Sequence, residues 1–176
     1  GLLEGKLTFS AADAEQRIAV DLRGTSFVTR PLSMRTFSMT GTANHPWDNP
    51  RFEGQLKSSA AVAMGRPLEA LVADVEGNAD DFAIRLDAKG SADLQTVLGL
   101  DARITRTAET AIAVTRFETD VGGIAAALDG TARLTVADDF ITLQSTRLSI
   151  EGGSVLADLR VDRIQETLDG TFDVSE

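Results

Sequence analysis

The sequence predicts an all-β protein, and three observations support this fold class. Apolar side chains fall on every second position through most of the chain, which is the period of a strand with one buried face. The alternation is clearest within residues 124–136, where Leu134 and Val136 alternate with Arg133 and Thr135. Clusters of Asp, Asn, Gly and Pro separate the alternating segments, as expected for turns. Only one short segment departs from this period.

The first half of the chain is predicted to consist of strands joined by short turns. Residues 10–15 form a polar cluster between two alternating segments, so a hairpin is the economical prediction there. Residues 44–50 contain two prolines and turn-forming Asn and Asp, and are predicted to form a loop. The alternating segments in this half are residues 3–9, 17–23, 36–41, 52–56, 71–75 and 82–89.

One short helix is predicted near residues 92–99. Leu94, Val97 and Leu98 are at helical spacing, a Ser or Asp before them could cap the N-terminus, and Gly99 could end the helix. Alternation then resumes up to the end of the sequence. The further strands are predicted from residue 104, and at residues 112–114, 124–136, 141–143, 148–150, 155–161 and 168–174.

A weak internal repeat accompanies the predicted strands. An acidic residue followed by glycine recurs at residues 4–5, 53–54, 76–77, 129–130, 151–152 and 169–170. Glycine is expected at such places to allow a turn or bulge with positive φ. Recurring units of this kind predict a stack of strands that grows in one direction.

The length and the first residues of the sequence indicate one domain from a longer polypeptide. A chain of 176 residues is long enough for a single domain. It opens on Gly1-Leu2-Leu3 without Met or a basic leader, so we expect residues 1–176 to be a single segment cut from a longer polypeptide. No uninterrupted apolar run exceeds five residues, so the segment is not expected to span a membrane as a helix.

Charge and cysteine content exclude several classes of partner and site. The formal net charge is −10, from 27 acidic and 17 basic residues. Such a surface repels phosphate backbones, so nucleic acid is not expected as a partner. The absence of cysteine excludes disulfides, thiolate nucleophiles and zinc–thiolate sites, and fits either the cytosol or an oxidising compartment.

No catalytic or metal-binding motif stands out from the strand pattern. His45 is the only histidine and lies beside Trp47 in the predicted loop, where a solvated side chain is the expected role. The Asp pairs at residues 80–81 and 138–139 lie in predicted turns, where backbone hydrogen bonding is favoured over a calcium site. We therefore expect no enzyme activity, no cofactor and no metal site.

The apolar face of the predicted sheet must be covered, and no long amphipathic helix is present to cover it. The sheet could pack on a second sheet, close into a barrel, or curl into a trough that a ligand fills. An apolar lining with hardly any polar group suits a phospholipid acyl chain. The predicted lining consists of Leu7, Phe9, Ile18, Val20, Leu22, Phe37, Met39, Phe52, Leu56, Leu71, Val75, Phe82, Ile84, Leu86, Ile104, Ile112, Val114, Leu128, Leu134, Val136, Ile141, Leu143, Leu148, Ile150, Val155, Leu159, Val161, Phe172 and Val174.

Several short runs resemble the TamB family of large proteins from Gram-negative bacteria, which are related to the AsmA-like proteins. The runs are FETDVGG at residues 117–123, LDGTARL at 128–134 and LSIEGG at 148–153, within serial strands that start on an acidic residue and glycine. The resemblance covers essentially the whole segment, and its motifs are degenerate. It implies a curled, U-shaped sheet, or β-trough, of serial antiparallel or mixed short strands.

The resemblance also implies a location and a role. Family members are periplasmic and anchored to the inner membrane, here by a segment outside residues 1–176. They are implicated in phospholipid transport to the outer membrane and, with an outer-membrane barrel partner of the TamA or BamA kind, in protein translocation, secretion and autotransporter assembly. Our leading hypothesis is a non-enzymatic hydrophobic conduit segment whose inward residues contact lipid acyl chains, or the amphipathic strands of a client protein by edge pairing. Both ligands require the same apolar lining, so the sequence does not separate them. The alternative is a structural β-sandwich or adhesin-like module with a filled core and no ligand.

Overall fold

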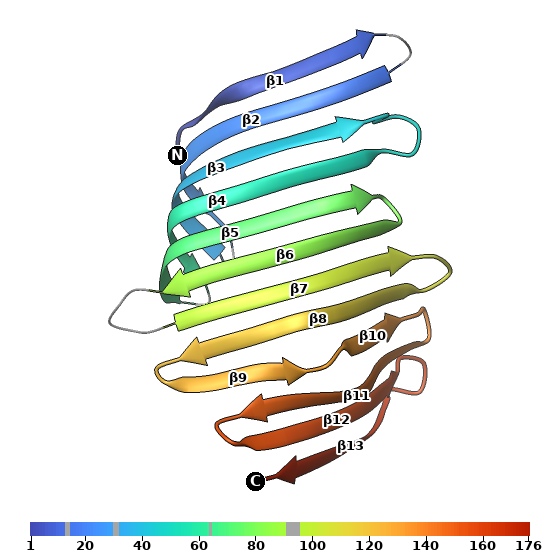
Figure 1. The fold of residues 1–176 in the computed structure, drawn as a ribbon. Helices are drawn as coiled ribbons and strands as arrows, with labels where there is room; N and C mark the ends of the chain where they lie inside the picture. Colours follow the sequence, from blue (N-terminus) through green and yellow to red (C-terminus); the bar gives the residue numbers. More distant parts are fainter. Residues whose placement is uncertain (13–14, 30–31, 64, 91–95) are drawn as a thin grey trace.

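The described residues form one antiparallel sheet of 13 strands (Figure 1). The structure, a computed structural model, describes residues 1–12, 15–29, 32–63, 65–90 and 96–176. The all-β prediction is confirmed. None of the described residues is helical, so no helix that could cross a membrane is found among them.

The strands follow one another along the chain with short connections. Their bounds are β1 Leu3–Ala12, β2 Glu15–Val28, β3 Leu32–Asn44, β4 Arg51–Ala63, β5 Arg66–Asn78, β6 Asp81–Gly90, β7 Thr96–Arg106, β8 Thr110–Val121, β9 Ile124–Asp129, β10 Ala132–Val136, β11 Phe140–Ile150, β12 Gly153–Asp162 and β13 Thr167–Ser175.

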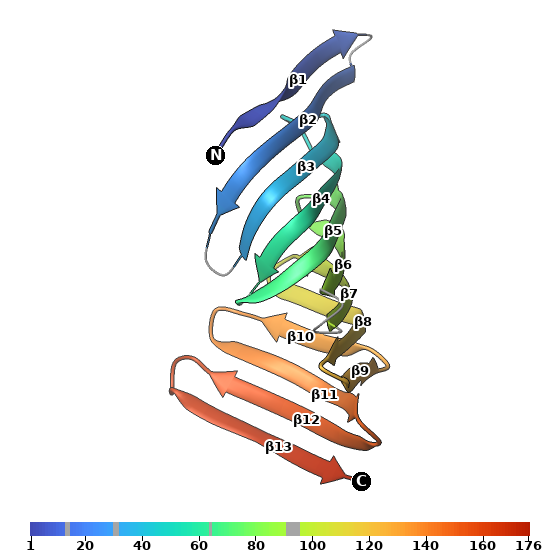
Figure 2. The same cartoon turned by 90° about the vertical axis from the view of Figure 1, so that its left-hand side faces the viewer.

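The sheet is an antiparallel meander in which nearly every strand pairs with its neighbours in sequence. The exception is the pair β9 and β10, which together occupy one position between β8 and β11. They are separated at Gly130, whose φ of 92° suits glycine. β1 and β13 are therefore the two edges, and the strand direction turns progressively between them (Figure 2).

A crease folds one end of strands β2–β6 back over the sheet. Ser26 has a φ of 58° within β2, and the β3–β4 register shifts on both sides of Thr36. The β5–β6 register shifts between Leu68 and Ala70. Because bulges bend strands, irregularities aligned across neighbouring strands fold the sheet along one line. Figure 1 shows the left-hand ends of β2–β5 turning behind the sheet.

The hydrophobic core lies inside this crease. Met34, Ala61 and Leu68 come from beyond the crease and pack with Leu71 and Ala88 from the other side of it, and each is at most 8% exposed. Partly buried residues that pack against them are Leu32, Phe37, Leu56, Ala63, Leu86 and Leu98. The apolar face is therefore the inner, concave face of a trough.

A close approach in the crease requires a glycine at position 24. A Cβ at Gly24 would lie about 2.5 Å from the Phe37 ring, closer than side-chain atoms pack. The Phe37 ring is also 5.8 Å from that of Phe27, in an edge-to-face arrangement. The absence of a side chain on Gly24 thus lets an aromatic pair fill the fold of the sheet.

The helix predicted near residues 92–99 is wrong where the structure describes it. Residues 96–99 belong to β7, and residues 92–95 lie outside the described residues. Leu98 pairs with Ala88 of β6 and with Thr119 of β8, while Val97 is 46% exposed on the opposite face. Because β7 pairs with strands on both sides, the backbone N–H and C=O groups of this segment are hydrogen-bonded within the sheet. These pairings outweigh the helical spacing of only three apolar residues.

The prediction for the acidic–glycine repeat is only partly right. Gly77, Gly130 and Gly152 have positive φ, as expected. The repeats at residues 4–5, 53–54 and 169–170 lie inside extended strands, and their glycines do not have positive φ. The shared dipeptide therefore does not mark a single structural role.

The trough is open, and its interior is not filled by a second layer. The accessible surface is 11748 Å² for an 18.7 kDa chain, whereas a compact monomer of this mass exposes about 8,300 Å². No described side chain is fully buried. All described strands belong to one sheet, so the second sheet of a sandwich is not present among them.

Candidate functional site

The pairing register places the predicted lining residues on one face of the sheet. Directly paired residues in an antiparallel sheet point to the same side. One row crosses the whole sheet: Phe9, Ile18, Ala43, Phe52, Gly77, Phe82, Ile104, Ile112, Leu134, Leu143, Leu159 and Gly170. The next row contains Leu7, Val20, Gly41, Gly54, Val75, Ile84, Ala102, Val114 and Ala132.

The remaining predicted residues fall on the same face in shorter rows. Leu22, Met39, Leu56 and Leu86 share a row, as do Leu128, Leu148, Val155 and Val174. The other members are Phe37 and Leu71, paired through Ser58; Val136, Ile141 and Val161; and Ile150 and Phe172. The structure thus brings the predicted set together on the inner face.

Two irregularities keep this face apolar in the second half of the sheet. The β7–β8 register shifts at Thr115, so Val114 and Phe117 both face inward although they are three positions apart, an odd spacing. In β11 the register shifts between Leu143 and Thr146, so Leu143 and Leu148 share a face. Each bulge adds one residue and so shifts the alternation by one position. With a strict period of two, the two residues of each of these pairs would lie on opposite faces of the sheet.

A hollow of about 340 Å³ lies in the middle of the inner face. Its floor is formed by Gly41 and Gly54, which are directly paired on β3 and β4. Its apolar walls are Ile18, Val20, Met39, Ala43, Phe52, Leu56, Ala73, Val75 and Ile84. The two glycines were absent from the predicted lining because they carry no side chain. The available signal was a glycine at an apolar position of the alternation in both strands.

Aromatic rings and one cation border this hollow toward the strand ends. The rings of Phe52 and Phe82 are 6.1 Å apart, and the Arg106 guanidinium lies 5.4 Å from the centre of the Phe82 ring. Arg106 follows Ile104 by two residues at the end of β7, so it is on the inner face at the rim of the trough. The inner face therefore combines an apolar floor with a positive charge at its margin.

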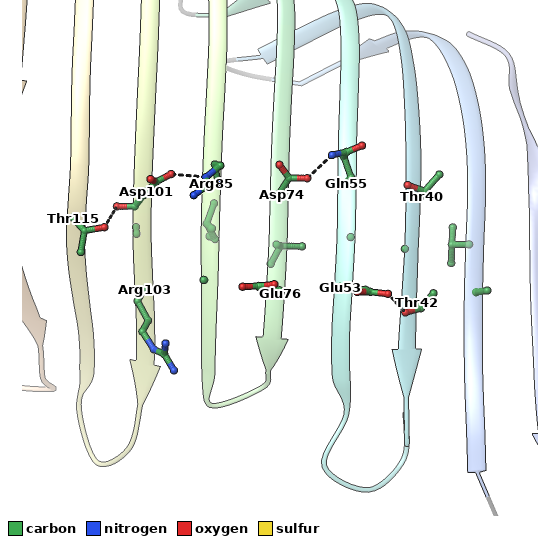
Figure 3. A pocket seen from close by; sticks show the side chains of 18 residues that line it. Thr40, Thr42, Glu53, Gln55, Asp74, Glu76, Arg85, Asp101, Arg103 and Thr115 are labelled. Carbon is green, nitrogen blue, oxygen red and sulfur yellow. Dashed lines mark hydrogen bonds and ion pairs between the residues drawn. The ribbon is translucent and has the colours of Figure 1, made fainter. Parts of the chain in front are cut away.

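A hollow of about 900 Å³ lies on the outer face, and several of its polar groups are bonded to one another (Figure 3). The Gln55 amide donates to Asp74 at 2.6 Å, and the Thr42 hydroxyl donates to Glu53 at 3.0 Å. Arg85 pairs with Asp101 at 3.1 Å. This wide, shallow surface is the solvated side of the sheet.

Further ion pairs connect β6, β7 and β8 on the outer face. Arg116 contacts Asp87 at 2.6 Å and Asp101 at 3.2 Å, and the hydrogen bond to Asp87 raises the pKa of Arg116. The Arg103 Nε–H donates to Asp81 at 2.7 Å, which holds the pKa of the Asp81 carboxyl below its ordinary value. The charged groups of Arg116, Arg103 and their Asp partners are thus engaged in ion pairs with one another.

The residues considered for chemistry are not assembled into a site. His45 lies in the turn after β3 with a φ of 49°, and its backbone N–H donates to the Gln16 carbonyl. Asp81, one of the calcium candidates, is paired with Arg103. Among the described residues, no group of three His, Cys, Asp or Glu side chains could hold a metal ion.

Trp47 is the most prominent exposed aromatic residue at the end of the trough. Its side chain is 77% exposed in the turn between β3 and β4. Together with Pro46, Phe9 and Ile18 it borders a small hollow of about 260 Å³. The structure thus places Trp47 beside one end of the apolar rows, at the mouth of the trough.

Comparison with known proteins does not assign the chain to a family. No family model matches the sequence, and neither curated proteins nor solved structures show a significant similarity to it.

Proposed function

We propose that this chain is a non-enzymatic segment of a hydrophobic conduit whose inner face binds the acyl chains of phospholipids. The observation that supports the proposal most is the inner face outside the crease, where apolar rows run across the sheet and no second sheet of described strands packs on them. An exposed apolar surface of this extent is unfavourable in water and is typical of a binding surface.

The hollow over Gly41 and Gly54 is the preferred place for an acyl chain. Its walls offer apolar area and hardly any hydrogen-bonding side chain, which matches the chemistry of a hydrocarbon. Burying roughly ten methylenes there would contribute about 8 kcal/mol before the loss of freedom on binding is subtracted. This is enough for stable binding of one chain.

Arg106 supports a phospholipid over a plain hydrocarbon. Its guanidinium is at the rim of the inner face, beside the Phe82 ring. A guanidinium suits a phosphate group because it can donate two parallel hydrogen bonds. A headgroup at the rim and acyl chains over the glycine floor would satisfy both ends of the lipid.

The cellular role that we propose follows the resemblance to the TamB family. In that role the segment belongs to a periplasmic protein anchored to the inner membrane. It would participate in phospholipid transport to the outer membrane and in protein translocation and secretion, with an outer-membrane barrel partner of the TamA or BamA kind. The U-shaped single sheet supports this proposal because a trough, unlike a filled sandwich, offers a continuous apolar path.

The test is to fill the hollow without disturbing the sheet. A Cβ at Gly54 would meet its nearest neighbours at 3.4 and 3.5 Å, ordinary contact distances, so the position accommodates a Cβ, and the β-branched side chain of Gly54→Val suits a strand. The purified chain is expected to carry phospholipid detectable by mass spectrometry. Gly54→Val should lower affinity for a fluorescent phospholipid about tenfold or more.

Charges on the two faces provide the matched comparison. Ile84→Asp and Leu134→Asp place a carboxylate on the inner face and should greatly reduce lipid binding and transfer, because a charge is poorly tolerated in an apolar site. Ala83→Asp and Thr135→Asp place the same charge on the outer face and should leave binding unchanged. The proposal fails if no lipid co-purifies, or if inner-face and outer-face variants bind lipid equally.

A further inference from the structure

One rim of the trough repeats a contact between an arginine and an aspartate. This rim is formed by the turns that follow β5, β7, β10 and β12, on the right-hand side of Figure 1. The Arg106 N–H donates to the Asp80 carbonyl at 2.6 Å, and the Arg163 N–H donates to the Asp139 carbonyl at 2.7 Å. Each bond adds one pair to a ladder between two interior strands, β6–β7 or β11–β12.

The arginines of both contacts are on the inner side of the rim. Arg106 follows Ile104 by two positions, and Arg163 follows Val161 by two positions. Ile104 and Val161 belong to the inner face, and residues two positions apart in a strand share a face. The two contacts therefore lie where the apolar lining ends.

The charged groups at these contacts are not paired with one another. The Arg106 guanidinium lies 5.4 Å from the centre of the Phe82 ring. Among the described residues, neither Arg106 nor Arg163 forms an ion pair with a carboxylate. On the outer face, by contrast, Arg85 contacts Asp101 of the neighbouring strand at 3.1 Å. The rim arginines thus retain their hydrogen-bonding capacity for a ligand.

A ligand that satisfies both members of such a contact carries a phosphate and an ammonium a few atoms apart. A guanidinium donates two parallel hydrogen bonds to a phosphate, and a carboxylate accepts charge-assisted hydrogen bonds from a primary ammonium. Directly paired positions of an antiparallel sheet have Cβ atoms about 5 Å apart, so one compact group can reach both side chains. Phosphoethanolamine has this chemistry, whereas the quaternary ammonium of phosphocholine has no N–H to donate.

The local charge favours a zwitterionic headgroup over an anionic one. Glu109 follows Arg106 in the β7–β8 turn, and Asp138 precedes Asp139, so carboxylates outnumber the arginine at each contact. An anionic phosphoglycerol headgroup would gain the arginine but would be repelled by these carboxylates. Phosphoethanolamine brings its own cation and avoids this repulsion.

The two contacts are far enough apart for two lipids. Four strand-to-strand steps lead from β7 through β8, β10 and β11 to β12. At about 4.8 Å per step this is roughly 19 Å along the sheet. Ile112, Leu134 and Leu143 lie between the contacts in one inner-face row. Acyl chains of two lipids can therefore lie side by side on one apolar surface.

We propose that Arg106 with Asp80, and Arg163 with Asp139, form two headgroup sites that select phosphoethanolamine lipids. In each site the guanidinium binds the phosphate, and the carboxylate accepts hydrogen bonds from the ammonium. The second site and the choice of headgroup go beyond the proposed function. They rest on it, because acyl chains on the inner face supply most of the affinity.

Headgroup competition tests the selectivity. Competitors with the same two acyl chains and different headgroups displace an acyl-labelled phospholipid from the purified chain. Phosphoethanolamine lipid should bind about fivefold tighter than phosphocholine lipid and about tenfold tighter than phosphoglycerol lipid. Equal affinities, or displacement by soluble phosphoethanolamine at the same concentration, overturn the lipid-headgroup sites alone. If diacylglycerol with these chains also fails to bind, the proposed function fails with them.

Substitutions at the sites separate the roles of the two groups. Asp80→Asn combined with Asp139→Asn should bring phosphoethanolamine and phosphoglycerol lipids to within about twofold of each other. Arg106→Gln combined with Arg163→Gln should weaken every phospholipid about tenfold and leave diacylglycerol binding unchanged, which also shows that the sheet remains folded. Loss of diacylglycerol binding together with phospholipid binding would refute a role confined to the headgroup.

Outer-face variants and lipid counting complete the test. Asp21→Asn and Arg160→Gln make the same changes on the outer face and should alter neither affinity nor preference. Native mass spectrometry should show up to two phosphoethanolamine lipids on the parent chain and one on Arg163→Gln. The two-site proposal is overturned if Arg163→Gln still carries two lipids, or if rim and outer-face variants behave alike.

Discussion

The first half of the sheet, around β3–β6, and the second half, around β9 and β10, share one alternating sequence pattern. They differ in how far their apolar face is covered. All five buried apolar residues among those described lie in β3–β6. β3, β4 and β5 are each 13 residues long and extend past the crease, so their ends fold over the inner face. β9 and β10 have 6 and 5 residues, and no core forms on them. Long strands that bend at aligned bulges therefore cover part of the inner face in the first half, whereas the face over β9 and β10 remains open.

The largest expected difference between the halves is in the cost of removing a core side chain. Leu71 is 5% exposed in the crease, so Leu71→Ala should lower the free energy of unfolding by about 3 kcal/mol. Leu143 is half-buried on the open half, and Leu143→Ala should cost about 1 kcal/mol. Urea unfolding of both variants measures the difference. Equal costs would mean that the crease is not the principal core.

Hydrogen exchange should distinguish the halves residue by residue. Amides of β5 near Leu71 are expected to exchange only on global unfolding, because the crease covers them. Amides of β9 and β10 should exchange at least about tenfold faster, since both strands end at the break around Gly130. Mass spectrometry of peptic fragments measures this contrast, and uniform protection across the sheet would refute it.

A smaller effect is expected from replacing the glycine at the break between β9 and β10. Gly130 has a φ of 92°, and a Cβ there would meet nothing within 4 Å. Gly130→Ala should therefore cost about 1 kcal/mol through backbone conformation alone. Gly54→Val, in an extended strand, should be neutral or slightly stabilising. Thermal unfolding of the two variants compares them, and an undestabilised Gly130→Ala would show that the break does not depend on glycine.

The smallest effect concerns the ion pairs that join the halves at β6–β8. The pKa of Asp81 is lowered mainly by its hydrogen bond to Arg103, so the stability from this pair is present above about pH 4 and is lost as pH falls through the lower folded-state pKa. Both groups are largely exposed, so the contribution is small. Arg103→Gln should lower the urea midpoint slightly near neutral pH, and the difference should disappear at a pH below the lowered pKa of Asp81. An unchanged difference at both pH values would exclude the pair as its source.

The strands and their faces could be predicted from sequence, whereas the crease could not. Alternation identified Leu134 and Ile84 as inner-face residues because it reports a local property of the backbone. The crease depends on irregular pairing around Ser59, which turns Ala61 inward and leaves Val62 40% exposed, the reverse of strict alternation. A bulge is defined by the partner strand, so one strand alone carries no signal for it.

The candidate site shows the same limit. Its walls were predictable as the apolar positions of strands, but its depth comes from Gly41 and Gly54 lying directly opposite each other. This coincidence depends on the β3–β4 register, which sequence periodicity does not fix. The helical prediction at Val97 and Leu98 failed for a related reason: adjacent apolar residues can be divided between two faces of a strand.

The meander order has a mechanical consequence. Every strand is bonded to strands close to it in sequence, and the edges β1 and β13 carry the first and last described strands (Figure 2). A pull on the two ends of the chain would therefore load the outermost hydrogen bonds a few at a time, so that strands peel off singly and never resist as a block. The same locality allows a chain threaded from one end to add strands in succession, without waiting for distant segments to arrive.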